Sequence, residues 1–160
     1  MKTLINSLAI AAAMLWNVSA HAGASRVGND YYEDIFPSPS CSGTGSCSTQ
    51  SSAPTPAGVF FRMQHLYCRI STTSTSAVMV VLDLQIWTGP QGTGTLVKSV
   101  PLSFSQPVSN SNLSNYYSID HDILLTTGSG RYIVIAAGFT ANTAITMNCA
   151  ITGNLIPPPQ

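Results

Sequence analysis

The stretch from Ala77 to Phe104 decides the fold. Its sequence is AVMVVLDLQIWT (77–88), GPQGTG (89–94) and TLVKSVPLSF (95–104). In the first run one set of alternate positions is apolar and the other is more polar: Val78, Val80, Leu82, Leu84 and Ile86 against Asp83, Gln85 and Trp87. Alternation with a period of two predicts a β-strand with one buried and one wet face. The glycines and proline of 89–94 predict a loose hairpin loop. Because a hairpin cannot bury its own apolar face, other strands must cover it.

Further strands are predicted on both sides of this hairpin. They cover residues 59–70, 116–125, 131–139 and 144–151, and turns at 71–76, 126–130 and 141–143 separate them. No segment has helical periodicity. The pattern predicts an all-β fold, an antiparallel β-sandwich over residues 59–155, with a proline-rich tail at 156–160. Within it, GSGRYIV (128–134) resembles the turn and tyrosine-bearing strand of immunoglobulin-like and jelly-roll sandwiches, which implies a fold and no function.

Two local irregularities are expected in these strands. In the strand 59–70 the apolar phase changes near Gln64, which a β-bulge or burial on both faces would produce. Pro101 lies within the second strand of the hairpin and has no N–H to donate, so it predicts a sheet edge there.

Residues 1–22 have the features of a secretory signal peptide. Lys2 supplies a positive start, residues 8–16 form an apolar run, and Ala20-His21-Ala22 fits the small-x-small pattern of a cleavage site. Cleavage after Ala20 is the alternative. The apolar run is shorter than the ~20 residues of a membrane span, and no later segment is long enough. The protein is therefore expected to be secreted, periplasmic or at the cell surface, and the short leader with one lysine is typical of bacteria.

Charge is scarce along the whole chain. Charged residues make up 8% of it, with six basic against six acidic. One of the basic residues is Lys2, so five against six remain after the leader, and none of them form a basic cluster. This argues against nucleic acid or an anionic membrane as a partner. The wet faces must consist of Ser, Thr, Asn, Gln and Gly, a surface that permits self-association because little repulsion opposes it.

Residues 23–58 differ in composition from residues 59–155. The acidic and aromatic run 30–37 is compatible with a strand docking on the domain, a partner-binding segment, or no structure. Residues 37–58 are nearly all Ser, Thr, Gly, Pro, Cys and Ala, which bury too little apolar surface to offset chain entropy. We therefore expect an N-terminal arm or linker, which could contact a second copy of the chain or another surface protein.

Four cysteines in a secreted chain predict disulfides. Three pairings are possible, and we favour Cys41 with Cys47 and Cys68 with Cys149. The first closes a short glycine-containing loop, and the second joins the first and last predicted strands of the sandwich. A four-thiolate zinc site is the rival, but zinc ligands usually come in close pairs, and neither Cys68 nor Cys149 has such a neighbour.

No catalytic set emerges, so an enzyme is not expected, and no cofactor is implied. No serine lies in a Gly-x-Ser-x-Gly elbow. His65 alternates with apolar residues, as a hydrogen-bonded strand histidine would. Asp120 and Asp122 flank His121 in the sequence. These two carboxylates could ligate Ca²⁺ with loop oxygens, although simply keeping one strand face wet is the favoured interpretation. A glycosidase pair of Asp83 with either of them would need a cleft that the sequence does not place.

Aromatic residues near loops are the candidate binding residues. Trp87 ends the central strand beside the 89–94 loop, and Tyr116 and Tyr117 begin a strand after a polar loop. Such rings among amides and hydroxyls suit stacking on sugars or on a protein partner. The alternative for Trp87 is that it caps the core.

Together these features predict a secreted, non-catalytic, disulfide-stapled β-sandwich. Its expected role is structural or adhesive: a filament, matrix or surface-assembly subunit. The first alternative is a carbohydrate-binding module that uses exposed aromatic residues, and the second is a small secreted hydrolase.

Overall fold

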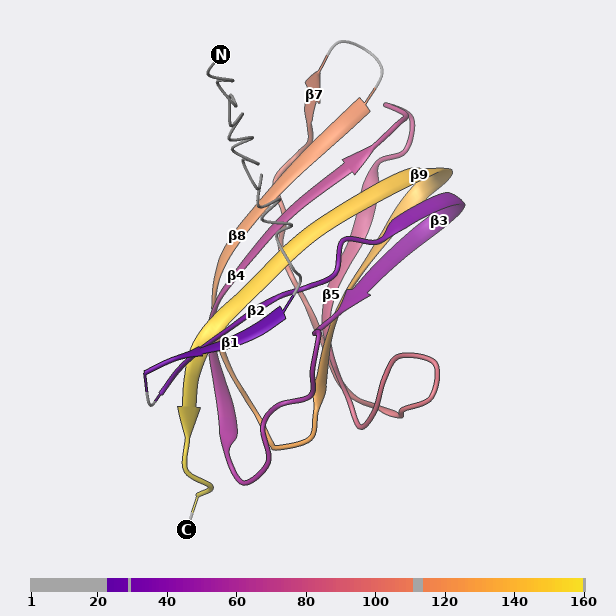
Figure 1. The fold of residues 1–160 in the computed structure, drawn as a ribbon. Coiled ribbons are helices and arrows are strands. Elements are labelled where there is room, and N and C mark those ends of the chain that lie inside the picture. The colour runs from indigo at the N-terminus through magenta and orange to yellow at the C-terminus, as the bar shows by residue number, and fades with distance from the viewer. Residues whose placement is uncertain (1–22, 29, 111–113, 160) are drawn as a thin grey trace, which may run out of the picture.

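The computed structural model describes residues 23–28, 30–110 and 114–159. The predicted signal peptide, residues 1–22, lies outside them. Within these ranges the chain forms β-strands and no helix (Figure 1). The strands are β1 (Gly23–Val27), β2 (Tyr31–Ile35), β3 (Ser40–Gln50), β4 (Phe60–Thr72), β5 (Met79–Trp87), β6 (Leu96–Pro101), β7 (Val108–Asn110), β8 (Ser114–Thr127) and β9 (Tyr132–Ile156).

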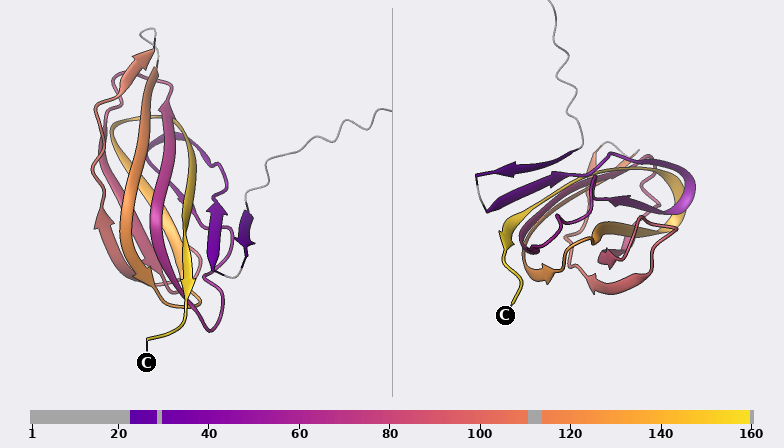
Figure 2. Two further views of the ribbon diagram at one scale, coloured as in Figure 1. Left: turned by 90° about the vertical axis from the view of Figure 1, so that its left-hand side faces the viewer. Right: turned by 60° about the horizontal axis from the view of Figure 1, so that its bottom comes forward.

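All strand pairs are antiparallel, and they form two layers that share β9. The first, called here the β4 layer, has the order β1-β2-β9-β4-β8-β7. The second, the β5 layer, consists of β3, β9, β5 and β6. Figure 2 shows the two layers packed face to face. The predicted antiparallel β-sandwich is therefore confirmed.

Strand β9 joins the two layers without a break. Residues 132–139 pair with β5, and residues 145–156 pair with β4. The predicted turn at 141–143 is wrong, because the chain there continues as a bent strand (Figure 1). The partner β3 follows β9 around this corner and absorbs the bend in its own register shifts, between Cys41 and Ser46. Hydrogen bonds along the corner replace the turn that the sequence indicated.

The segment 23–58 is part of the sandwich and not a linker. Residues 31–35 pair with β9, as expected for a docking strand, and β1 pairs with their outer side. The composition argument fails for 37–58, because β3 gains its backbone partners from β9 although its side chains are small and polar. Side chains after residue 46 are buried as well: Cys47, Thr49, Ser51 and Thr55. The sandwich begins at residue 23 rather than 59, and β9 continues to Ile156.

Strand β4 contains the bulge that the sequence predicted. Its register with both neighbours shifts between Met63 and His65. The shift turns apolar residues on either side of Gln64 to the same inner face: Phe61, Met63, Leu66, Cys68 and Ile70, all at most 1% exposed. Opposite the bulge, Gly153 of β9 lies so close that a Cβ atom there would be 2.1 Å from the carbonyl oxygen of Arg62. Only glycine fits that approach.

Strand β5 follows the predicted alternation over its second half. Leu82, Leu84 and Ile86 are buried. The first half departs from it, because the register with β9 shifts between Met79 and Val81. Val80 is therefore 55% exposed and Met79 is buried in its place. The hairpin partner β6 pairs only with β5 among the described strands, which confirms the sheet edge predicted from Pro101.

Both predicted disulfides form. Cys41 joins Cys47 within β3, and Cys68 of β4 joins Cys149, its cross-strand neighbour in β9. The core between the layers closes around Tyr117, whose ring packs edge-on against Phe104 and Phe139. Its hydroxyl accepts a 2.8 Å hydrogen bond from the backbone N–H of Met79, so one residue fastens the β4 layer to the β5 layer.

Candidate functional site

The outer face of the β4 layer gathers charged and aromatic side chains. Cross-strand register places Tyr67 beside Asp120, and His65 beside Asp122. Arg69 lies 5.6 Å from the centre of the Tyr67 ring. The further members are Glu33 and Arg62, with exposed apolar side chains between them: Tyr31, Ile35, Val108, Tyr116 and Leu124. We call this surface the charged face.

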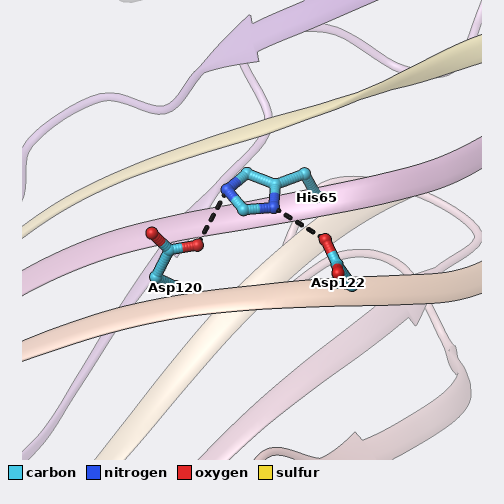
Figure 3. A network of polar contacts seen from close by, with 3 residues as sticks. All are labelled: His65, Asp120 and Asp122. Atoms are coloured by element: carbon cyan, nitrogen blue, oxygen red, sulfur yellow. Dashed lines mark hydrogen bonds and ion pairs between the residues drawn. The ribbon is translucent and has the colours of Figure 1, made fainter.

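His65 stands at the centre of the charged face, with one carboxylate on each side (Figure 3). Its Nε2 is 3.0 Å from Asp120 Oδ1 and its Nδ1 is 3.2 Å from Asp122 Oδ1. Only the protonated ring can donate to both carboxylates at once. The three side chains are 40%, 68% and 95% exposed, so solvent screens the pairs, and each contributes under about 1 kcal/mol.

The carboxylates of Asp120 and Asp122 are both turned toward His65. The sequence offers Asp120 and Asp122 as Ca²⁺ ligands, but each faces a different nitrogen of His65, which separates the two carboxylates by the width of a ring. Over the described ranges, no three His, Cys, Asp or Glu side chains are grouped to hold a metal ion. The hydrogen-bonded state expected for His65 is what the structure shows.

His121 contacts Ser103 on the segment that follows β6. The ring Nε2 is within hydrogen-bond distance of the Ser103 carbonyl oxygen and 3.3 Å from its hydroxyl. The contact fastens the 102–107 segment across the open side of the sandwich.

Asp34, which the sequence did not single out, is a fully buried carboxylate on β2. Its Oδ1 accepts hydrogen bonds from the Ser52 hydroxyl at 2.9 Å and the Ser52 N–H at 3.3 Å, and its Oδ2 accepts one from Tyr32 at 3.5 Å. Burial raises the pKa of Asp34, and the hydrogen bonds oppose that rise. Burial beside Asp34 also raises the pKa of Tyr32. The carboxylate fastens the loop after β3 to β2, which is a structural role.

The outer face of the β5 layer carries a hollow of about 410 Å³. We call it the Trp87 hollow. Strands β3, β5 and β9 and the 89–94 loop contribute its walls: Cys41, Ser46, Cys47, Ser48, Gln85, Trp87, Gln91, Ala136 and Ala137. Trp87 is half-buried there, and its Nε1 donates a 3.0 Å hydrogen bond to Gln85 Oε1. Trp87 thus lies on the outer face and does not cap the core.

The loop between β5 and β6 folds back over this hollow toward β3. Gln91 Oε1 accepts a 2.8 Å hydrogen bond from the Ser48 hydroxyl, and the Gln91 N–H donates to Gln50 Oε1 at 2.7 Å. Gly89 and Gly94 face each other so closely that a Cβ at Gly94 would lie 2.5 Å from the Gly89 nitrogen. The glycines thus allow the tight loop that carries Gln91 to the hollow.

The two tyrosines predicted as ligand-binding residues lie in different environments. Tyr116 is 47% exposed and lines a second hollow, of about 400 Å³, on the charged face with Arg69 and Val108. Tyr117 is 3% exposed and packs mainly in the core, although it also contributes to the wall of this hollow. Strand alternation separates the two neighbours to opposite faces. Trp87 and Tyr116 lie on different layers and do not form one site.

No protein-family model and no curated protein matches this chain. Two similar solved structures are dimeric latent PorU from Porphyromonas gingivalis and the T=1 particles derived from infectious bursal virus. The first has a TM-score of 0.41 and 14% identity, covering 86% of this chain and 14% of PorU. The second has a TM-score of 0.30 and 13% identity, covering 81% of this chain and 40% of the viral one. The chain thus spans less than half the length of either protein. Such similarity carries no function.

One structural observation concerns whether a helix of this chain could cross a membrane. Within residues 23–28, 30–110 and 114–159 there is no helix of the length and apolar character that crossing a bilayer requires.

Proposed function

We propose that this chain is a secreted, non-catalytic structural or adhesive protein that assembles with further copies of itself through the charged face. The observation that carries the proposal is the gathering of exposed tyrosine, arginine and aliphatic side chains on this one sheet surface. The expected N-terminal arm contributes to this face from within the sheet, because residues 31–35 pair with β9 of their own chain and leave Tyr31 and Ile35 exposed.

The tyrosine and arginine side chains of the charged face support a role in protein contact. Tyrosine and arginine are enriched at protein interfaces and among the residues that contribute most of the binding energy. Arg69 lies over the ring of Tyr67. The exposed side chain of Tyr116 lies beside Val108 of the neighbouring strand. Leu124 is 93% exposed on the same face and adds apolar area to it.

A second copy of the chain fits this face because both signs of charge are on it. Arg62 and Arg69 supply positive charge, and Glu33, Asp120 and Asp122 supply negative charge. A two-fold contact can place the positive part of one copy against the negative part of the other. The near-zero formal net charge of the chain adds no long-range repulsion between copies.

The compartment is inferred from the disulfides and the leader. Two disulfides among the described residues are typical of an oxidising, extracellular environment. The signal-peptide features of residues 1–22 support export, and the short length and single lysine of that leader support a bacterial source.

Sedimentation velocity over a range of concentrations tests the assembly. We expect the wild-type chain to form dimers or larger species, and we expect Tyr116→Ser combined with Leu124→Ser to weaken them at least tenfold. The control is Val80→Ser, which removes a 55% exposed side chain from the β5 layer and should leave association unchanged. A wild-type chain that stays monomeric at every concentration, or that loses association only through Val80→Ser, would overturn the proposal.

A further inference from the structure

We propose that the Trp87 hollow binds a neutral carbohydrate. This inference concerns the β5 layer and does not depend on the assembly of chains through the charged face. The hollow combines an aromatic ring, side-chain amides and hydroxyls within about 410 Å³, which is the range of small-molecule sites.

Hydrogen bonding leaves the amides of this hollow with free donors. Gln85 Oε1 accepts a hydrogen bond from the indole N–H of Trp87, and Gln91 Oε1 accepts one from the Ser48 hydroxyl. Within the described part of the chain, no hydrogen bond engages the Nε2 of either glutamine. Each amide therefore presents an NH₂ group, fixed in direction by its bonded oxygen. A ligand rich in acceptor oxygens, such as the hydroxyl and ether oxygens of a sugar, satisfies both.

The indole ring supplies the apolar surface that a sugar also needs. Trp87 is only half-buried, and its bond to Gln85 holds the ring in one orientation. Pyranose rings present C–H faces as well as hydroxyls, so they can stack on an aromatic ring while their edges bind polar groups. Ala136 widens the hollow beside the ring because its side chain is small.

The Trp87 hollow differs from the charged face in its lack of charged side chains. Its lining contains no Asp, Glu, Lys, Arg or His. A charged sugar, a phosphate or an ionised peptide side chain would lose its water there and find no counter-charge. A neutral ligand avoids that cost.

The hollow is also preorganised. The 89–94 loop is closed by hydrogen bonds from the N–H groups of Thr88, Thr93 and Gly94, and its tip is bound to β3 through Gln50. The opposite wall, on β3, is held by the Cys41–Cys47 disulfide. A site that needs no ordering on binding keeps more of its contact energy as affinity.

The test uses the fluorescence of Trp87. The sequence has two tryptophans, Trp16 and Trp87. Because Trp16 lies in the predicted leader, the emission of the oxidised chain without residues 1–22 reports Trp87 alone. A panel of neutral oligosaccharides (glucans, galactans, mannans and chitin fragments) is screened on an array. Positive members are then titrated by tryptophan emission and, for variants without Trp87, by calorimetry.

We expect at least one neutral oligosaccharide to bind and to change the emission of Trp87. Trp87→Ala should weaken its affinity about tenfold or more. Gln91→Ala, in an exposed loop where folding is not at risk, should weaken it about fivefold. Tyr116→Ala, the matched aromatic change on the charged face, should leave it unchanged. Thermal melting of each variant confirms that the sandwich is intact.

Several results would overturn the inference. These are an array without a neutral ligand, binding only to acidic glycans, and affinity that depends on Tyr116 and not on Trp87 or Gln91. Displacement of the sugar by unrelated peptides with equal affinity would assign the hollow to protein recognition instead. Each of these outcomes is independent of sedimentation, because the assembly proposal predicts no effect of Trp87→Ala on the oligomeric state.

Discussion

The two layers of the sandwich share β9 and have similar inner faces, but their outer faces differ. The β4 layer carries His65 between two aspartates and arginine beside tyrosine, on an open surface. The β5 layer carries amides, hydroxyls and one tryptophan around a hollow that a loop overhangs. We propose the first as the contact with a second copy of the chain and the second as the site of a small neutral ligand.

The difference shows that an average composition conceals local specialisation. With 8% charged residues, the sequence predicted wet faces of Ser, Thr, Asn, Gln and Gly. That description fits the β5 layer around the Trp87 hollow. It fails for the β4 layer, where strands far apart in the sequence bring five charged residues to one face: Glu33, Arg62, Arg69, Asp120 and Asp122.

The sharpest way to break the sandwich is to place a charge between the layers. Leu82→Asp puts a carboxylate at a position that is 1% exposed, whereas Val81→Asp puts one at the adjacent position, which is 46% exposed. We expect the first to destabilise by about 4 kcal/mol or more and to prevent folding, and the second to cost less than about 1 kcal/mol. Circular dichroism and urea unfolding measure both. Equal tolerance of the two changes would mean that the faces of β5 are reversed.

The two disulfides are expected to differ in how much they stabilise the fold. Cys68–Cys149 lies in the β4 layer and closes a sequence separation of 81 residues, while Cys41–Cys47 lies within β3, where that strand follows β9 around the corner between the layers, and closes a separation of 6. The chain-entropy model assigns them about 4.5 and about 2.5 kcal/mol. Replacing the first pair by serine should therefore lower the melting temperature clearly more than replacing the second. The reverse order would show that native contacts around β3, rather than unfolded-chain entropy, dominate.

Glycines in the two halves of β9 give a finer comparison. A Cβ at Gly153 would lie 2.1 Å from the Arg62 carbonyl oxygen, but one at Gly138 would lie an ordinary 3.5 Å from Val81. Gly153→Ala should destabilise by about 1–3 kcal/mol, because the β4 bulge must move. Gly138→Ala should be neutral within about 0.5 kcal/mol. Chemical denaturation measures both, and a tolerated Gly153→Ala would indicate that the bulge adapts.

The smallest expected effect is the pH dependence that Asp34 adds to the β4 layer. Because burial raises its pKa above the ordinary 3.8, the folded state holds the proton more tightly than the unfolded chain. The stability from this group is complete below that ordinary value and is lost as pH rises through the folded pKa. Asp34→Asn keeps an acceptor for Ser52 and does not titrate. We expect the wild type to lose unfolding free energy relative to this variant as pH rises from about 4. A wild type that gains on the variant over this range would mean that hydrogen bonds outweigh burial.

The features predicted correctly from the sequence are those that depend on the pattern of neighbouring residues. Alternation marked the buried side of β5 at Leu82, Leu84 and Ile86, and a phase change marked the bulge at Gln64. The disulfide pairing was predicted from loop length and strand position. Each of these depends on a few neighbouring residues or on a single pairing.

What was missed depends on partners distant in sequence. The small polar side chains of β3 gave no signal, since its strand character comes from β9 about 90 residues later. The Trp87 hollow brings Ser48, Gln85 and Gln91 together from separate strands and a loop. Only Trp87 was visible in advance, through its place beside a glycine-rich loop. Asp34 lies in the acidic and aromatic run 30–37, where nothing in the sequence distinguishes it from the partly exposed Glu33 beside it.

The continuity of β9 governs the order in which the chain can fold. Strands β2, β3, β4 and β5 all pair with β9, which is the last strand of the described residues. A chain that emerges N-terminus first therefore holds most of its strands without their common partner until residues 132–156 arrive. Such long-range pairing makes folding slow. The Cys41–Cys47 bridge can close early, whereas Cys68 must wait for Cys149. The two layers therefore cannot be joined before residues 132–156 are available.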